Sequence, residues 1–227
     1  MGSIWSQTCS IGRRPPLRGH LKTQAAVVGA GMAGVLTAYA LQQAGLSVVV
    51  LEADRIAGGQ TQNTTAKITS QHGLIYSRLI QSFGEETARR YAKANQDAVR
   101  AYQDLIDVQG ISCDWEERCA YLYGPDVTVL QEEAEAARRL GLPASFTREV
   151  SIPIPHDGAV CFEGQAQFHP LKFLKVLADQ LTIYEQSRVL TAEGDLLTTE
   201  LGSVQAEHIV FACHFPFVNF PGMYFAR

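Results

Sequence analysis

Three glycines and one carboxylate carry the clearest chemical signal in the sequence. Gly29, Gly31 and Gly34 have the G-x-G-x-x-G spacing, and Glu52 follows about 20 residues further on. In such a turn the first glycine allows a sharp bend, the second admits a pyrophosphate close to the backbone, and the third lets a helix pack against a strand. The helix N-terminus attracts the anion, and the carboxylate accepts hydrogen bonds from ribose hydroxyls. These residues therefore indicate dinucleotide binding.

The glycines and the carboxylate need a strand, a helix and a second strand to position them, and the apolar pattern supplies all three. Residues 24–28 are a short apolar run, residues 32–44 have helical composition closed by Gly45, and residues 47–51 are a β-branched run of the buried type. The competing explanation is a glycine-rich segment that simply packs closely, and it leaves the coincidence of these features unexplained. Glu52 would also repel a 2′-phosphate, which disfavours NADP.

The order of the later elements favours FAD over NAD, because the third parallel strand follows only after a long insertion. The expected elements are helices at 85–109, 127–140 and 170–180, strands at 114–123, 145–154, 159–167 and 181–185, a meander at 189–192, 196–199 and 203–206, and a last buried strand at 209–213. We predict an α/β fold. In it, a Rossmann-type FAD-binding domain is interrupted by part of an α+β substrate domain.

This pattern divides the chain into three parts. Residues 1–22 form an irregular arm that packs on the body or stays mobile. Residues 23–75 and 165–227 form the FAD-binding domain, and residues 76–164 form the helical and substrate-domain insertion. Residues 58–70 are rich in Gly, Thr, Gln and Asn, as expected of a loop whose backbone and hydroxyls make contacts.

Composition and charge exclude several other classes. The formal net charge is −4, and 46% of the residues are hydrophobic, as in a globular protein. No basic face with interleaved aromatic residues is present, so nucleic acid is not expected as a partner. The longest apolar run, residues 25–41, contains the motif glycines and falls short of the about 20 residues of a membrane span. We therefore expect neither a signal peptide nor a transmembrane helix.

The cysteines indicate a reducing, cytoplasmic setting. Their number is odd, and they form no C-x-x-C pair and no dense pattern of the disulfide-scaffold kind. They are Cys9, Cys113, Cys119, Cys161 and Cys213. No metal site is predicted from them.

Several segments together resemble the FAD-dependent D-amino-acid oxidase superfamily, which includes glycine and sarcosine oxidases. They are residues 28–34, 50–55, 58–67 and 209–212. Within that superfamily, residues 65–74, 167–170 and 221–227 resemble a bacterial branch of FAD oxidoreductases that often carries a C-terminal Rieske iron–sulfur domain. The similarity covers nearly the whole chain and is more specific for FAD than for a substrate.

The resemblance implies a set of cofactor-binding residues. It assigns the pyrophosphate to the glycine turn, the adenosine ribose to Glu52, the adenine to the neighbourhood of Arg55 and Val189, and the flavin to residues 61–66. The full set is Gly29, Gly31, Met32, Ala33, Gly34, Glu52, Ala53, Arg55, Thr61, Thr64, Thr65, Ala66, Val189 and Ala212.

The implied reaction moves a hydride from the carbon that bears an amine to flavin N5, so the expected substrate is a small amine or amino acid. This chemistry needs no nucleophilic triad, and the sequence offers none. Lys67 matches a loop position at which related oxidases often have a basic side chain that faces the flavin. The positive charge of such a side chain could stabilise the reduced, anionic flavin. The alternative is a surface lysine. His72 and His169 either face the active site or are structural hydrogen-bonding residues.

The resemblance also implies that the chain is the N-terminal portion of a longer fold. In the superfamily, the groups that hold the substrate carboxylate and cap the flavin come largely from the part that would follow residue 227. Rieske ligand motifs are absent, so no iron–sulfur cluster is expected. Aromatic residues gather near the end of the chain, and we expect this segment either to associate with further protein or to fold back over its own core. They are Phe215, Phe217, Phe220, Tyr224 and Phe225.

Two alternatives to an amine-oxidising flavoenzyme stay open at this point. One is an NAD-dependent dehydrogenase with an unusual insertion. The other is a non-catalytic dinucleotide-fold fragment, or a subunit that depends on a partner chain.

Overall fold

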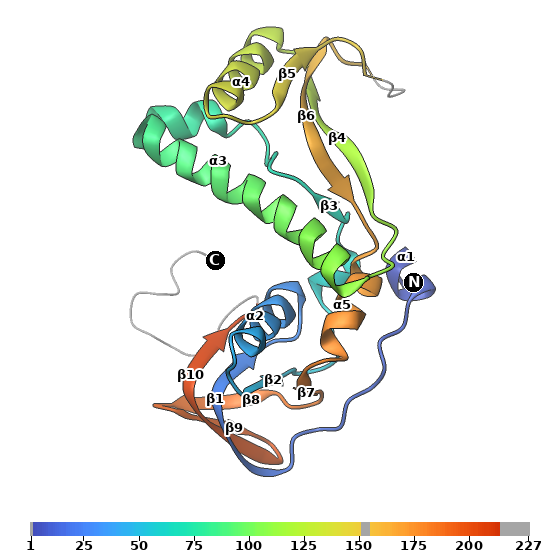
Figure 1. The fold of residues 1–227 in the computed structure, drawn as a ribbon, viewed down its shortest axis with the longest axis vertical. Coiled ribbons are helices and arrows are strands. Elements are labelled where there is room, and N and C mark those ends of the chain that lie inside the picture. The colour runs from blue at the N-terminus through green and yellow to red at the C-terminus, as the bar shows by residue number, and fades with distance from the viewer. Residues whose placement is uncertain (1, 151–154, 214–227) are drawn as a thin grey trace. The chain divides into compact units, whose positions relative to one another are not determined.

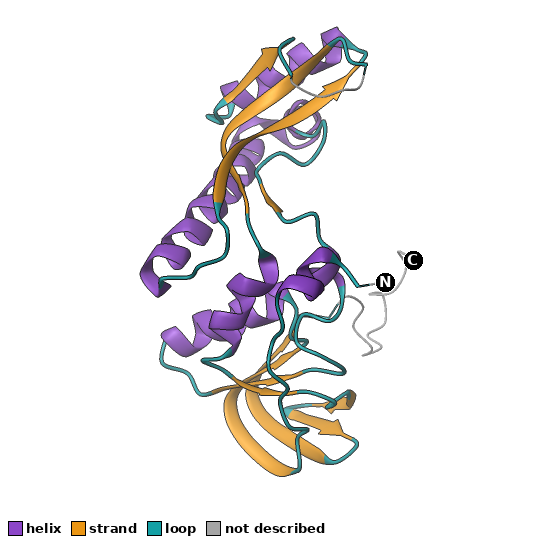
Figure 2. Cartoon of the chain, turned by 90° about the vertical axis from the view of Figure 1, so that its right-hand side faces the viewer, coloured by secondary structure: helices purple, strands orange, loops and turns teal. Residues whose placement is uncertain are grey.

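The computed structural model describes residues 2–150 and 155–213. The chain divides into two compact units, each with its own sheet (Figures 1 and 2). The first unit is residues 1–64 together with 170–227, and the second unit is residues 65–169. The aromatic segment near the C-terminus lies outside the described residues.

The division between the units falls after residues 64 and 169, whereas the sequence suggested boundaries at residues 75 and 165. Strand β3 (Lys67–Ile68) pairs antiparallel with β6 (Gly158–Gln167). Because this pairing joins both flanks of the insertion to one sheet, residues 65–75 and 165–169 lie in the second unit.

The first unit contains a six-stranded sheet in the order β7-β2-β1-β10-β9-β8. Its strands are β1 (Gly19–Val28), β2 (Val48–Leu51), β7 (Thr182–Tyr184), β8 (Val189–Glu193), β9 (Leu196–Thr199) and β10 (Gly202–Phe211). The first four strands in the sheet order are parallel, whereas β9 pairs antiparallel with both β10 and β8. The parallel strands β1 and β2 end in buried apolar residues, as expected for a sheet with helices on its faces.

Two predictions for this sheet are wrong, and both errors have the same cause. The last strand of the meander and the strand at 209–213 are one continuous strand, β10, and the arm expected to be irregular through residue 22 already enters β1 at Gly19. Strands β1 and β10 pair in parallel from Gly19 opposite Gly202 to Val28 opposite Phe211. The backbone of each strand thus supplies hydrogen-bond partners for the other strand. The apolar pattern of either segment alone does not show this pairing.

The helices of the first unit are α1 (Ile4–Thr8), α2 (Met32–Gln43) and α5 (Pro170–Ala178), with a 3-10 turn η1 at Gln60–Asn63. Two of these helices, α2 and α5, were expected from the sequence, whereas α1 lies in the arm that was expected to be irregular. Helix α2 begins directly after Gly31 and ends before Gly45, which has a φ of 91°. It packs against β1, β2 and α5, so it is held against the sheet along its length (Figure 1).

The second unit is an antiparallel sheet with helices packed on one face. Its elements are β3, α3 (Tyr76–Gln109), β4 (Glu116–Gly124), α4 (Val127–Arg139), β5 (Ala144–Thr147) and β6. Strand β6 pairs with β3, β4 and β5, and its residues Val160 and Phe162 pack with Leu130 and Ala137 of α4 in the core. Of the strand expected at 145–154, only the first part is β5, and residues 151–154 lie outside the described residues.

Helix α3 is longer than predicted because it joins two helical segments across a kink. Gly84, with φ of 79°, separates a first segment from the predicted helix at 85–109. The first segment is capped by a buried side chain of α4, Glu133, which accepts hydrogen bonds from the N–H groups of Ile75 (2.9 Å), Tyr76 (2.8 Å) and Ser77 (3.0 Å). A carboxylate at this position satisfies orphan N–H groups and opposes the positive end of the helix dipole.

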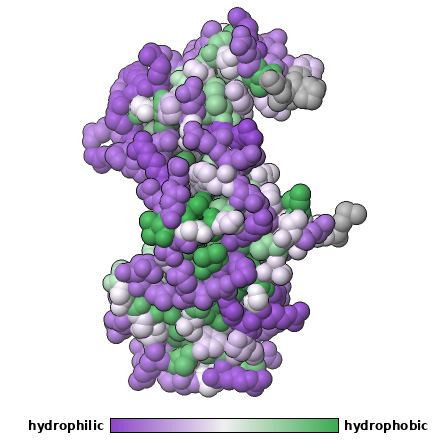
Figure 3. Space-filling model, turned by 45° about the vertical axis from the view of Figure 1, so that its right-hand side comes forward, coloured by the Kyte–Doolittle hydropathy of each residue, from purple (hydrophilic) through white to green (hydrophobic). Residues whose placement is uncertain are grey.

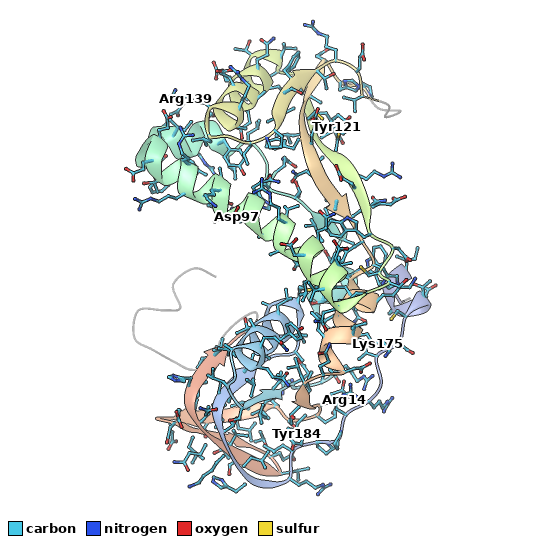
Figure 4. The ribbon with its side chains drawn as sticks, viewed as in Figure 1. Arg14, Asp97, Tyr121, Arg139, Lys175 and Tyr184 are labelled. Carbon is cyan, nitrogen blue, oxygen red and sulfur yellow. The ribbon has the colours of Figure 1, made fainter. Side chains whose placement is uncertain are left out.

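The second unit shows mainly hydrophilic residues in the view of Figure 3. Ion pairs along α3 contribute to this surface, such as Arg89 with Glu85 at 2.6 Å and Lys93 with Asp97, which is labelled in Figure 4. Among the described residues, no helix is both long and apolar enough to cross a membrane.

The N-terminal arm, residues 2–18, packs along the first unit. Its anchors Ile11 and Leu17 are buried, and the Leu17 N–H donates to Ser187 Oγ at 2.8 Å. Figure 4 shows Arg14 beside Tyr184 at the end of β7, where the Arg14 N–H donates to Glu185 Oε2 at 2.9 Å. The arm is therefore part of the fold of this unit.

Glu185 joins the arm to the loop after β2. Its side chain is only 2% exposed, forms an ion pair with Arg55, and accepts a hydrogen bond from the Ile56 N–H at 2.8 Å. Arg55 in turn donates to the carbonyl oxygen of Ile11 at 2.9 Å. A buried carboxylate with this many donors is stabilising only while every partner is in place.

We predict that Glu185→Ala lowers the free energy of unfolding by about 3 kcal/mol, because it leaves backbone N–H groups without an acceptor and Arg55 without its ion-pair partner. Chemical denaturation measures the change. The matched control is Asp179→Ala, which removes a carboxylate 39% exposed that pairs with Arg14 at 2.5 Å, and it should cost less than about 1 kcal/mol. Equal effects of the two variants would contradict the structural role of Glu185.

Candidate functional site

A pocket of about 680 Å³ opens in the first unit where β1, β2 and β10 end and α2 begins. Carboxyl ends of parallel strands are the usual position of ligand sites in such sheets. The pocket is lined by Val28, Gly29, Gly31, Met32, Ala33, Leu51, Glu52, Ala53, Arg55, Ala57, Gly58, Gly59, Gln60, Thr61, Arg188, Val189, Leu190, Ala212 and Cys213.

The glycine turn forms the floor of this pocket, and each glycine has its own reason to be there. A Cβ on Gly34 would lie 1.8 Å from the Gly29 carbonyl oxygen, so only glycine lets α2 approach β1 this closely. Gly29 has a φ of 105° and a Cβ there would meet the Ala212 carbonyl oxygen at 3.0 Å. Gly31 has an ordinary φ of −79°, and among the described residues the one atom within 4 Å of a Cβ there is Thr61 Oγ1, at 3.4 Å. The position of Gly31 is thus open toward the pocket.

The N-terminus of α2 faces this opening without a side-chain cap. Gly31 is the N-cap residue, and the Val35 N–H makes the first hydrogen bond of the helix, to the Gly31 carbonyl oxygen at 3.0 Å. The Met32 N–H donates to Thr61 Oγ1 at 3.0 Å. The N–H groups of Ala33 and Gly34 precede the first helical bond, so together with the helix dipole they offer a site for an anion.

Glu52 is held in place by backbone groups on both sides. Its Oε2 accepts a hydrogen bond from the Ala30 N–H at 2.7 Å, and its Oε1 accepts one from the Asp54 N–H at 2.9 Å. Each carboxylate oxygen keeps a further lone pair. A carboxylate fixed in this way can accept hydrogen bonds from the two hydroxyls of a ribose.

The thiol of Cys213 completes the pocket beside Glu52. Burial raises the pKa of Cys213, a backbone hydrogen bond lowers it, and the negative charge of Glu52 raises it. The net shift keeps the thiol protonated near neutral pH, so it adds no negative charge to a site that would receive a pyrophosphate.

Most of the predicted cofactor-binding residues gather in this one pocket. They are Gly29, Gly31, Met32, Ala33, Glu52, Ala53, Arg55, Thr61, Val189 and Ala212. Gly34 lies behind the turn, where it allows the close helix–strand contact. Thr64 is not among the lining residues, and its carbonyl oxygen accepts a hydrogen bond from the Trp5 indole N–H at 2.8 Å.

The other predicted residues belong to the second unit. Thr65 is exposed, and Ala66 is buried, with its carbonyl oxygen accepting the Phe168 N–H at 3.3 Å. Lys67 and His72 are exposed, and His72 Nε2 lies 3.2 Å from Asn95 Oδ1. His169 is buried, and its backbone N–H donates to the Cys113 carbonyl oxygen at 2.6 Å.

The sequence analysis missed several lining residues, and their signals differ. Gly58, Gly59 and Gln60 lie in the loop that composition already marked as contact-forming, and Ala57 directly precedes it, but no spacing singles these residues out. Cys213 follows the predicted Ala212 directly. Arg188 and Leu190 flank Val189 and line the pocket from the start of β8, and nothing in the local pattern announces them.

A glycine turn, an uncapped helix N-terminus and a fixed carboxylate at the ends of parallel strands define a Rossmann-type dinucleotide-binding protein. The model of one family, described as DAO: FAD dependent oxidoreductase, matches residues 24–219. The chain belongs to this family, whose cofactor is FAD.

Relatives with curated names cover the chain more fully than the chain covers them. A Bacillus subtilis (strain 168) protein named as a Rieske 2Fe-2S iron–sulfur protein, YhfW, is 34% identical over 237 aligned positions, covering 99% of this chain and 47% of the relative. The gamma-glutamylputrescine oxidoreductase of Escherichia coli (strain K12) is 26% identical, covering 82% and 47%. The chain thus spans about half the length of these relatives.

Solved structures share the fold at lower identity. The L-amino acid deaminase from Proteus myxofaciens, in complex with anthranilate, has a TM-score of 0.71 at 18% identity, covering 93% of this chain and 49% of that one. The glycine oxidase from Geobacillus kaustophilus has a TM-score of 0.60 at 18% identity, covering 85% and 55%. At this identity the likeness concerns the fold alone.

Two glycine variants should separate the binding role of the turn from its folding role. We expect Gly31→Ala to weaken FAD binding by at least about tenfold, because a methyl group enters the open side of the turn. Its unfolding free energy should change by no more than about 1 kcal/mol, since its φ suits alanine. Gly34→Ala should instead lower the unfolding free energy by more than about 2 kcal/mol, because its Cβ overlaps a carbonyl oxygen.

Titration with FAD and chemical denaturation measure the two effects. Loss of stability in Gly31→Ala equal to that in Gly34→Ala would show that the turn has no open side and would contradict the binding role.

Proposed function

We propose that this protein is an FAD-dependent oxidoreductase that oxidises an amine or an amino acid, and that FAD binds in the pocket of the first unit. The observation that carries the proposal is the presence, in one pocket, of an uncapped helix N-terminus and a carboxylate fixed by two backbone N–H groups. The names of the relatives, which refer to gamma-glutamylputrescine, glycine and L-amino acids, support the substrate class. Bound FAD would supply the electron-accepting ring, whose N5 takes up the hydride.

Different residues of the pocket would bind the charged and the polar parts of FAD. The N–H groups at the start of α2 and the helix dipole would neutralise the pyrophosphate. Glu52 would accept hydrogen bonds from the ribose and repel a 2′-phosphate, which selects against NADP-type ligands. Arg55 and Arg188 line the pocket around the residue predicted to meet the adenine, Val189, and can lie against the face of the base.

Residues 61–66 lead from the first unit into the second, and we propose that Thr61, Thr64, Thr65 and Ala66 lie along the ribityl chain and flavin ring. Lys67 and His72, both exposed, are the candidates of this chain for a side chain that faces the ring. We also propose a reducing, cytoplasmic setting, which the free state of all five cysteines supports.

We expect the purified protein, after incubation with FAD and removal of unbound cofactor, to retain a flavin spectrum that denaturation releases. Glu52→Ala should weaken FAD binding by at least about tenfold, because hydrogen bonds to a charged group contribute about 1.5–3 kcal/mol. The matched control is Asp54→Ala, an exposed carboxylate two residues further along the same loop, which should bind FAD as the unaltered chain does.

Substrate class is tested on the FAD-loaded protein by anaerobic addition of amines and amino acids. Loss of the oxidised flavin absorbance supports the proposed reaction. Retention of NAD in place of FAD would overturn it in favour of a dehydrogenase, and a folded protein that retains neither nucleotide would favour a non-catalytic or partner-dependent subunit.

A further inference from the structure

The N-terminal arm holds both loops that line the cofactor pocket. We call residues 52–64, after β2, the first loop, and residues 185–188, between β7 and β8, the second loop. Arg55 in the first loop and Arg188 in the second line the pocket. The arm contacts each loop by hydrogen bonds, so it can set their positions although the described residues of the arm do not line the pocket themselves.

The contacts with the first loop lie at its two ends. Near its start, the Arg55 guanidinium donates to the Ile11 carbonyl oxygen at 2.9 Å. At its far end, the Trp5 indole N–H donates to the Thr64 carbonyl oxygen at 2.8 Å, and helix α1 packs against η1. The wall of the pocket formed by the first loop is therefore held between two points of the arm.

The contacts with the second loop fix it to the same segment. The Arg14 N–H donates to Glu185 Oε2 at 2.9 Å, and the Leu17 N–H donates to Ser187 Oγ at 2.8 Å. Both acceptors are buried, which makes these bonds costly to lose. Arg188, the next residue, is exposed toward solvent and lines the pocket.

Helix α1 buries less surface than the rest of the arm. It has five residues and none of them is buried, whereas the anchors Ile11 and Leu17 lie further along the arm. Its contacts with the unit include those of Trp5, which is half-buried, and packing against η1 and α5. A short element with so little buried surface belongs to the least stable part of a fold, where local opening is frequent.

We propose that the arm is a positioning segment for FAD, and that docking of α1 and binding of FAD are thermodynamically coupled. FAD in the pocket would contact residues of the first loop from Arg55 to Thr61 and order them, and an ordered loop presents the Thr64 carbonyl oxygen to Trp5. By linkage the effect is reciprocal, so a docked arm strengthens FAD binding by the same factor by which FAD favours docking. This inference rests on the proposed FAD site.

The test compares Trp5→Phe, which removes the indole N–H and keeps a ring, with Gln7→Ala, which removes a side-chain donor that bonds only within the arm, to the Gly2 carbonyl oxygen. We expect Trp5→Phe to raise the dissociation constant for FAD about fivefold, the equivalent of one hydrogen bond. Deletion of residues 2–9, which removes α1, should raise it further. Gln7→Ala should bind FAD as the unaltered chain does.

A second readout separates coupling from general destabilisation. Arg13 is exposed, and trypsin cleavage after it reports on release of the arm. Saturating FAD should slow this cleavage in the unaltered chain and in Gln7→Ala. In Trp5→Phe, the factor by which FAD slows cleavage should be about five times smaller. The denaturation midpoints of the three proteins without FAD should be equal.

Binding of FAD by the unaltered chain, with the same affinity in Trp5→Phe and in the deletion variant, would overturn the coupling and leave the proposed function intact. A rate of cleavage after Arg13 that is the same with and without FAD would also overturn the coupling and leave the proposed function intact. Failure of the unaltered chain to bind FAD would overturn the proposed function and this inference with it.

Discussion

The close approach of helix α2 to strand β1 is the constraint on which the cofactor pocket depends. A Cβ on Gly34 would lie 1.8 Å from the Gly29 carbonyl oxygen, and Ala212, just after β10, would lie 3.0 Å from a Cβ on Gly29. Because the helix cannot move away without losing these contacts, its N-terminus stays directed at the ends of β1, β2 and β10. The proposed anion site is thus a product of backbone packing.

Glu52 and Glu185 extend this arrangement outward from the turn. Each is a carboxylate at the end of a parallel strand, and each accepts backbone N–H groups from a loop. Glu52 keeps capacity on the pocket side and can serve a ligand, whereas Glu185 is occupied by the arm, Arg55 and Ile56 and serves the fold. The same chemical group therefore has two roles, which follow from its exposure and from the donors around it.

The local parts of the fold could be predicted from the sequence, and the parts that depend on distant pairing could not. The glycine spacing, the apolar runs and Glu52 lie within one strand–helix–strand unit, so their pattern was sufficient to place most of the pocket. Polar side chains interrupt the apolar pattern at His20 and Lys22 of β1 and at Glu207 and His208 of β10, and the pairing between the two strands continues both strands through these positions. Arg188 belongs to the pocket through the position of β8 in the sheet, which no local signal encodes. Gly84 concealed the first segment of α3, because a glycine of positive φ breaks the helical pattern that the tertiary fold continues.

Under the proposed function, FAD is held at the turn between β1 and α2 in the first unit. Hydrogen–deuterium exchange of the protein with and without FAD locates the ligand most directly, because each amide reports on its own surroundings. FAD should slow exchange in peptides that contain residues 29–35 and 52–61, with little change in α4. Slowed exchange confined to the second unit, with residues 29–35 unaffected, would contradict the assignment of the pocket.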